Sequence, residues 1–182
     1  MRWWLSHRAD PKARVLADRH YNRQNIGAAG FVPPGRCLVL VTKPNEAFWV
    51  SSYPYAEYVR HAWAGAWVCS AFRNEGPHLS SELIREAVAC TLWKWEAPPL
   101  GMITFVDRSK VRQRRAGWGK CYLRAGFDLA RCPLHDGAEK ATCAACRSET
   151  EAGLLALQLL PDAMPEALAP QRESDNQMSF LP

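Results

Sequence analysis

The sequence predicts a single domain of the α/β (α+β) class, in which strands and helices are mixed along the chain. Three observations lead to this prediction. The chain has 182 residues, of which 48% are hydrophobic, and this suits one domain with a substantial core. A β-hairpin pattern runs from Arg36 to Ser52. A strand, a tight loop and an amphipathic helix follow between Ala66 and Trp95.

The first expected element is a polar helix over residues 8–25 that begins at Asp10-Pro11, because proline favours the first helical position. His20 and Tyr21 stand just before a glycine-rich turn, where side chains commonly reach a cleft. We therefore treat both as candidate site residues. A surface helix end with a basic last turn is the alternative interpretation.

The hairpin consists of two expected strands, Arg36–Val41 and Ala47–Ser52, joined by a turn over residues 43–46. An aromatic connection follows over residues 53–63, with three tyrosines, one histidine and one tryptophan. These rings could line a pocket for a base or pack on one another. We expect packing for most of them and a ligand contact for one or two.

The stretch between Ala66 and Trp95 carries the first candidate ligand site. Gly and Pro in the loop after Phe72 end the strand, and Ser80 and Ser81 suit the start of a helix. A strand, a tight loop and a helix N-terminus present backbone N–H groups to a phosphate. An ordinary turn without a ligand is the alternative. The candidate cofactor-binding residues are Cys69, Ser70, Arg73, Gly76, His78 and Ser80.

A buried strand over residues 100–106 is expected next, and Asp107 stands at its C-terminal end, where ligands bind in open α/β sheets. Asp107 is a candidate general base or substrate-orienting group, and capping of the following segment is the alternative. A short helix leads to Gly126-Phe127, and a closing strand is expected over residues 153–160.

Basic residues without any acidic one occupy residues 108–124, with Trp118 and Tyr122 among them. A solvated surface is the common explanation for a charge run, but interleaved aromatics favour a nucleic-acid contact. The net charge of +5 agrees with a polyanionic partner. The candidate nucleic-acid contacts are Arg108, Lys110, Arg112, Arg114, Arg115, Trp118 and Lys120.

Four residues over 131–147 have the spacing of a structural zinc site: Cys132, His135, Cys143 and Cys146. The polar segment between the two pairs could not fold alone, so a metal would be a useful staple. Accidental clustering of reduced thiols is the alternative. We expect residues 1–160 to form the domain, with the zinc site as an insertion.

We expect residues 161–182 to be a flexible tail, because Pro, Ala and charged residues are frequent there. Its segment Gln177–Leu181 is similar to the pentapeptide by which bacterial proteins dock on the replicative sliding clamp. We expect no membrane span, because no run of 18 apolar residues occurs, and no signal peptide, which makes the cytoplasm the expected compartment.

Two motifs resemble those of the GNAT acyltransferase superfamily. Arg73-x-x-Gly76-x-His78 resembles its pyrophosphate loop, although His78 stands where the family has a small residue. Gly119–Phe127 resembles its late helix, in which a tyrosine, here Tyr122, often protonates the thiolate of coenzyme A. The resemblance implies a mixed, mostly antiparallel central sheet flanked by helices, and acetyl-CoA or a related acyl-CoA as cofactor.

Within that superfamily the layout is most similar to the bacteriophage DNA-modification proteins of the Mom type. This resemblance implies transfer to a base amino group of phage or bacterial DNA, with adenine as the candidate base and catalytic positions at His20, Tyr21, Ser81, Asp107 and Tyr122. Such an amine must be flipped out of a duplex or lie in a single strand. Two alternatives stay open. One is an N-acyltransferase acting on a small-molecule or protein amine, and the other is a non-catalytic, zinc-stabilised adaptor for nucleic acid or the clamp.

Overall fold

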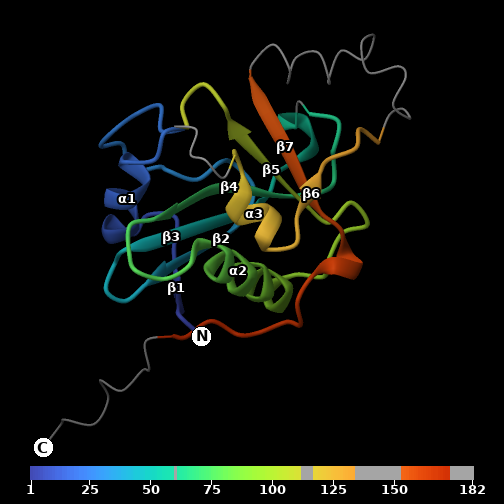
Figure 1. Ribbon diagram of the computed structural model, residues 1–182. Helices are drawn as coiled ribbons and strands as arrows, with labels where there is room; N and C mark the ends of the chain where they lie inside the picture. The colour runs from blue at the N-terminus through green and yellow to red at the C-terminus, as the bar shows by residue number, and fades with distance from the viewer. Residues whose placement is uncertain (60, 112–116, 134–152, 173–182) are drawn as a thin grey trace, which may run out of the picture.

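The computed structural model describes residues 1–59, 61–111, 117–133 and 153–172, and these form a mixed α+β arrangement around one sheet (Figure 1). The sheet has seven strands in the order β1-β2-β3-β4-β5-β7-β6. Neighbouring strands are antiparallel except for β4 and β5, which are parallel. The strands are β1 (Trp3–Ser6), β2 (Arg36–Thr42), β3 (Ala47–Tyr53), β4 (Trp67–Asn74), β5 (Met102–Asp107), β6 (Asp128–Leu129) and β7 (Leu154–Leu159).

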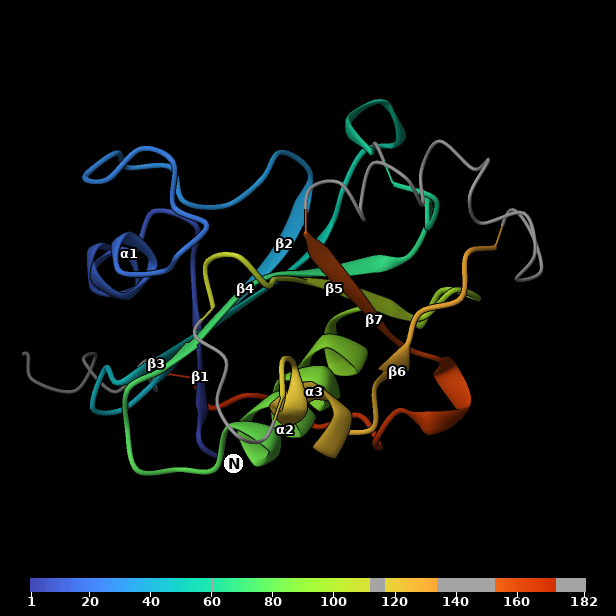
Figure 2. The same ribbon diagram turned by 45° about the horizontal axis from the view of Figure 1, so that its top comes forward.

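Helices cover both faces of this sheet (Figure 2). On one face lie α2 (Ser80–Lys94) and α3 (Lys120–Arg124), and on the other lies α1 (Pro11–Asp18). Alternation along the strands supplies both cores, because successive side chains point to opposite faces. In β2, Leu38 and Leu40 pack with the α2 side, whereas Val39 packs with the α1 side.

The hairpin strands β2 and β3, the helix α2, and the strands β4 and β5 before and after that helix begin and end within a few residues of their predicted bounds. α2 begins at Ser80 and ends at Lys94, and its buried face is the predicted apolar one. Its cap differs from the prediction. Leu79 is the N-cap residue, and the Ser80 hydroxyl instead accepts a hydrogen bond of 3.1 Å from the Asn74 side chain.

The predicted helix over residues 8–25 is wrong beyond Asp18. Its start is confirmed, since Asp10 is the N-cap residue and Pro11 is the first helical residue. After Asp18 the Arg23 guanidinium bonds the Asp18 carboxylate at 2.7 Å and the backbone oxygens of Ala28 and Gly30. These contacts fold residues 19–30 back on themselves, because side-chain bonds to nearby backbone compete with helical ones.

The strand β1 was not predicted. Trp3 is fully buried in it, and its indole N–H donates to the Leu83 oxygen of α2 at 2.8 Å. Residues 161–172, expected as part of a loose tail, lie along the domain. Leu168 N–H bonds the Ala89 oxygen at 3.1 Å, and Gln171 exchanges two backbone bonds with β1.

Several predictions fall outside the described residues: three of the four zinc ligands (His135, Cys143 and Cys146), the basic residues Arg112, Arg114 and Arg115, and the clamp-like segment 177–181. Within the described residues, no group of three or more His, Cys, Asp or Glu side chains could hold a metal ion. Among the same residues, no helix has the length and apolar character needed to span a bilayer.

Candidate functional site

The site begins where the parallel pair β4 and β5 separates. The two strands pair at three positions only, ending with Cys69 opposite Thr104. Beyond that point β4 continues to Asn74 and β5 to Asp107. A bulge in β4 accounts for the separation: Cys69 pairs with Ser51 and Ala71 with Val50, so Ser70 is the extra residue. A bulge bends and twists its strand, which turns β4 away from β5.

A pocket of about 160 Å³ occupies this gap, which we call the splay pocket. Residues from four parts of the chain line it: β4, β5, the segment after α1, and α3. These are Val68, Cys69, Ser70, Ala71, Phe72, Thr104, Phe105, His20, Tyr21, Asn22 and Tyr122. Among them are five candidates of the sequence analysis, namely His20, Tyr21, Cys69, Ser70 and Tyr122. The fold brings these together from widely separated positions in the chain.

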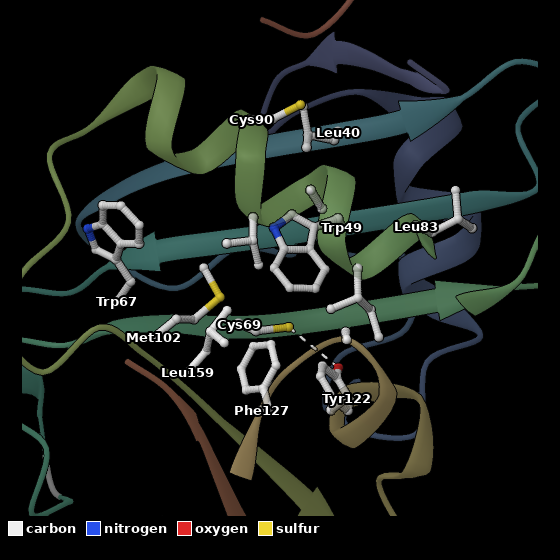
Figure 3. Packing of buried hydrophobic residues seen from close by; sticks show 14 of the residues in the cluster. Leu40, Trp49, Trp67, Cys69, Leu83, Cys90, Met102, Tyr122, Phe127 and Leu159 are labelled. Atoms are coloured by element: carbon white, nitrogen blue, oxygen red, sulfur yellow. Dashed lines mark hydrogen bonds between the residues drawn. The ribbon is translucent and has the colours of Figure 1, made fainter. Parts of the chain in front are cut away.

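Tyr122 and Cys69 form the floor of the splay pocket, and Figure 3 shows their side chains meeting beneath β4. The Tyr122 hydroxyl lies 3.5 Å from the Cys69 sulfur. Burial raises the pKa of Tyr122 well above its ordinary value, and burial raises the pKa of the Cys69 thiol to about 12. Both groups are therefore protonated at neutral pH, so the phenol at this floor is a proton donor and not a base.

Gly119 sets the position of Tyr122. It is the N-cap residue of α3 with φ of +67°, a left-handed conformation that favours glycine. A β-carbon at this position would also stand 2.6 Å from a methyl group of Leu157. α3 therefore starts close against β7, and its first turn directs Tyr122 into the core.

His20 and Tyr21 form the opposite wall. Their rings stack with centroids 4.4 Å apart, and His20 meets Phe48 edge-on. Burial, with a smaller contribution from the Arg73 charge, lowers the pKa of His20 to about 4, so the imidazole is neutral at pH 7. Its Nδ1 accepts the Asn22 backbone N–H at 3.2 Å. His20 is thus a neutral side chain that is held in place at this wall of the splay pocket.

Tyr21 lies against the part of β5 that β4 has left. Its hydroxyl is 3.4 Å from the Phe105 oxygen and also meets the Asp107 backbone. Burial raises the pKa of this phenol as well. Two protonated phenols, Tyr21 and Tyr122, therefore face the same small pocket.

Asp107 closes β5 as predicted, but it does not line the splay pocket. Its carboxylate accepts the Ser109 backbone N–H at 2.9 Å and the Ser109 hydroxyl at 2.5 Å, and Lys110 lies 3.5 Å away. The hydrogen bonds from Ser109 are the main cause that lowers its pKa. These are the capping bonds of the alternative interpretation, and a general-base role for Asp107 stays a prediction.

The loop between β4 and α2 has the expected order of strand, loop and helix, but its polar groups are largely engaged. Arg73 bonds the Glu75 carboxylate and the Arg19 oxygen, each at 2.5 Å. The N–H groups of Glu75 and Gly76 bond the Glu46 oxygen and the Asn74 side chain. By helix geometry, Ser80 and Ser81 keep backbone N–H groups without a partner inside α2. His78 is exposed, and Ser81 is half-buried outside the splay pocket.

A second, larger cavity of about 980 Å³ opens on the α1 side of the sheet, and we call it the wide cavity. It shares His20, Tyr21, Asn22, Ser70 and Ala71 with the splay pocket, so the two spaces meet at the bulge. Its other lining is Ala17, Arg23, Gln24, Asn25, Gly30, Phe31, Val32, Pro33, Pro34, Phe48 and Lys110. That lining contains aromatic rings, amides and two cationic side chains, with no carboxylate among its described residues.

The described residues of the basic run lie in different surroundings. Lys110 lines the wide cavity, and Arg108 is exposed, with its guanidinium donating to the Gly153 oxygen at 3.1 Å. Trp118 is half-buried against the core and donates to the Val111 oxygen at 3.3 Å, so its ring packs with the protein. Lys120 is the first residue of α3.

Sequence reasoning missed the amides Asn22, Gln24 and Asn25 and the β5 residues Thr104 and Phe105. The amides had a signal, since all three closely follow His20-Tyr21. Thr104 and Phe105 had none beyond membership of a buried strand, because they line a pocket only where β4 and β5 part.

Comparison with protein families, with curated proteins and with solved structures finds no match for this chain.

Proposed function

We propose that this protein is an acyltransferase that moves an acyl group from a coenzyme A thioester to the exocyclic amino group of a nucleobase in DNA. The observation that supports this best is the meeting of two spaces at the β4 bulge. A narrow pocket holds a buried phenol on one side of this point, and a wide cavity without a carboxylate in its described lining opens on the other. A transfer reaction needs a donor and an acceptor to approach one point from two sides.

The splay pocket suits the pantetheine arm of the donor. Where β4 and β5 separate, backbone groups of both strand edges no longer have the partner that parallel pairing gave them. An extended chain that carries amides can add to such an edge by main-chain hydrogen bonds. The pantetheine arm is such a chain, and its thioester end would reach the floor at Cys69 and Tyr122.

The donor pyrophosphate would then lie at the start of α2, which follows β4 directly. The partial positive charge of a helix N-terminus favours a phosphate, and Ser80 and Ser81 offer N–H groups there. Arg73 is the nearby cation of the family-like motif. To contact the pyrophosphate, Arg73 would have to break its ion pair with Glu75. We therefore expect the first turn of α2 to contribute more to pyrophosphate binding than Arg73 does.

Tyr122 supplies the proton in this mechanism. The acceptor nitrogen attacks the thioester carbonyl carbon, the carbon–sulfur bond breaks, and the sulfur leaves as a thiolate that takes the phenolic proton. The proton that the amine loses restores the phenol, so the products are an amide and the free thiol. The Tyr122 hydroxyl already lies 3.5 Å from a sulfur, that of Cys69, so a thiolate placed beside Cys69 would be within its reach. A buried phenol with a raised pKa stays protonated for this step.

The wide cavity would hold the acceptor, and its lining favours a neutral amine. A protonated alkylamine, such as that of lysine, is best held by carboxylates, but the charged groups in the described lining are Arg23 and Lys110. Arg23 is paired with Asp18 and Lys110 with Asp107. Amide side chains and aromatic rings are what proteins use to read and stack a base outside its helix.

The direct test is an incubation with acetyl-CoA and a single-stranded oligonucleotide containing all four bases, followed by nucleoside mass spectrometry. A lysine-containing peptide is the competing acceptor. We expect one nucleoside to gain the mass of an acetyl group and the peptide to remain unmodified. Acetylation of the peptide alone would contradict the nucleobase acceptor, and release of no free thiol with any acceptor would contradict the transferase.

A second test uses the basic run. If it holds DNA, a triple variant to alanine should make DNA binding less sensitive to salt. The slope of log K against log salt should fall by about one for each phosphate that the variant no longer neutralises. The changed residues are Arg112, Arg114 and Arg115. An unchanged slope would show that these three arginines do not contact DNA phosphates.

A further inference from the structure

A third space lies at the β1 edge of the sheet, away from the splay pocket. It has a volume of about 320 Å³, which is at the lower end of the range for small-ligand sites. It is lined by Leu5, Ser6, His7, Arg8, Cys37, Leu38, Val39 and Lys94, and we call it the edge pocket. None of these residues lines the splay pocket or the wide cavity.

The basic side chains of the edge pocket come from separate parts of the fold. His7 and Arg8 follow β1, and Lys94 is the last residue of α2, so cationic side chains from both meet at one hollow. Within the described residues, no carboxylate forms an ion pair with Arg8 or Lys94. Asp10 interacts with His7, but its carboxylate is held by the Ser6 hydroxyl at 2.6 Å and the Lys12 N–H at 2.8 Å.

Arg8 is fixed in position without being neutralised. Its guanidinium donates to the Gly35 oxygen at 2.6 Å and to the Cys37 sulfur at 3.2 Å. Neither acceptor is a carboxylate, and both bonds use the same terminal nitrogen, so the guanidinium keeps N–H groups for a ligand. Lys94 suits the C-terminal end of α2 on its own account, which explains its presence there but not its meeting with His7 and Arg8.

We propose that the edge pocket binds a phosphate group. Arginine and lysine are common ligands of phosphate oxygens, and the exposed side chain of Leu5 gives the hollow an apolar part for the group that carries the phosphate. The phosphate belongs either to a nucleic-acid backbone or to a free nucleotide. This inference does not rest on the proposed acyltransferase activity, because the two sites share no residue.

Cys37 provides a readout inside the pocket. Its thiol is half-buried in the lining, so a bound phosphate should shield it from a maleimide. The rate of Cys37 alkylation is measured by peptide mass spectrometry, with inorganic phosphate or a twelve-nucleotide thymidine strand added. Cys121, half-buried in α3, serves as the internal reference. We expect saturable protection of Cys37 and an unchanged rate at Cys121.

Two variants identify the charges. Lys94→Gln alters an exposed side chain and should weaken the protection by about threefold, as removal of one exposed ion pair does. Arg8→Gln should weaken it further. Arg85→Gln removes an exposed charge from the same helix outside the pocket and should leave protection unchanged. The melting temperature of each variant shows whether it is folded.

The experiment distinguishes the two possible sources of the phosphate, a nucleic-acid backbone and a free nucleotide. If both additions protect Cys37 and Lys94→Gln weakens both, the pocket holds a nucleic-acid backbone. If inorganic phosphate protects and the thymidine strand does not, the ligand is a free nucleotide or a related small phosphate. An alkylation rate of Cys37 that neither addition changes, or protection that Arg85→Gln reduces as much as Lys94→Gln, would overturn the proposal.

Discussion

Replacing Tyr122 by phenylalanine isolates the proton donor of the proposed reaction. The substitution keeps the ring and its edge-on contacts with Phe72 and Phe127, with centroids 6.2 and 5.4 Å away. It removes the hydroxyl, which lies 3.5 Å from the Cys69 sulfur. Because that distance is long and one of the two partners is a sulfur, the free energy of unfolding should fall by no more than about 1 kcal/mol.

The effect on the reaction should be far larger. Loss of a positioned general acid commonly lowers a rate by about 10²–10⁴-fold. The affinity for coenzyme A should stay within about threefold of the original, because the phenol acts on the thiolate and not on the bound ground state. Tyr53→Phe is the matched control, since Tyr53 is a half-buried tyrosine that stacks on Arg36 outside both cavities.

The assay is release of free thiol from acetyl-CoA in the presence of the oligonucleotide, with calorimetry for binding. Since burial raises the pKa of Tyr122, the rate of the original protein should also show no decline from loss of the phenolic proton up to about pH 10. A Tyr122→Phe protein that transfers at the original rate would refute the assignment. Equal losses in Tyr122→Phe and Tyr53→Phe would refute it too.

Three further predictions concern folding, pH and metal. Gly119→Ala should lower the free energy of unfolding in urea by about 1–3 kcal/mol, because of its φ of +67° and the close Leu157 methyl, whereas Gly117→Ala, with open space around it, should cost only about 1 kcal/mol. His20 has its pKa lowered by burial to about 4 when folded, so the unfolded chain binds the extra proton between about pH 6.5 and 4. The unfolding free energy should therefore fall as the pH drops through that window, by as much as about 3 kcal/mol, and the fall should be smaller in His20→Gln. The purified chain should hold one zinc ion by elemental analysis, and Cys143→Ser should release it; an equal metal content in both proteins would contradict the zinc site.

Much of the fold could be predicted because its elements are locally encoded. The apolar spacing in Ser80–Lys94 and the hairpin pattern before it are complete within their own segments. β1 escaped prediction because its short segment at the chain start carries too little pattern, and its burial depends on Leu83, 80 residues away from Trp3. The helix expected after Asp18 failed because Arg23 finds acceptors that a periodicity argument does not consider.

The candidate site, too, could be predicted from the sequence only in part. His20, Tyr21 and Tyr122 could be proposed from motifs, since each stands at the end of a recognisable element or within one. Their meeting could not be, because it depends on the bulge at Ser70 that parts β4 from β5. The orientation of the Asp107 carboxylate toward Ser109 is likewise a matter of side-chain geometry that the position of Asp107 at a strand end does not decide.

The measurement that tests the central claim most directly is a calorimetric titration of the protein with coenzyme A. A partner titration uses Ala71→Leu, which adds volume at the point where the two cavities meet, with Ala62→Leu as a control of equal size on a half-buried residue outside both. We predict saturable binding by the original protein and by Ala62→Leu, and loss of binding by Ala71→Leu. A folded original protein that binds no coenzyme A, or equal binding by all three, would contradict a donor site between β4 and β5.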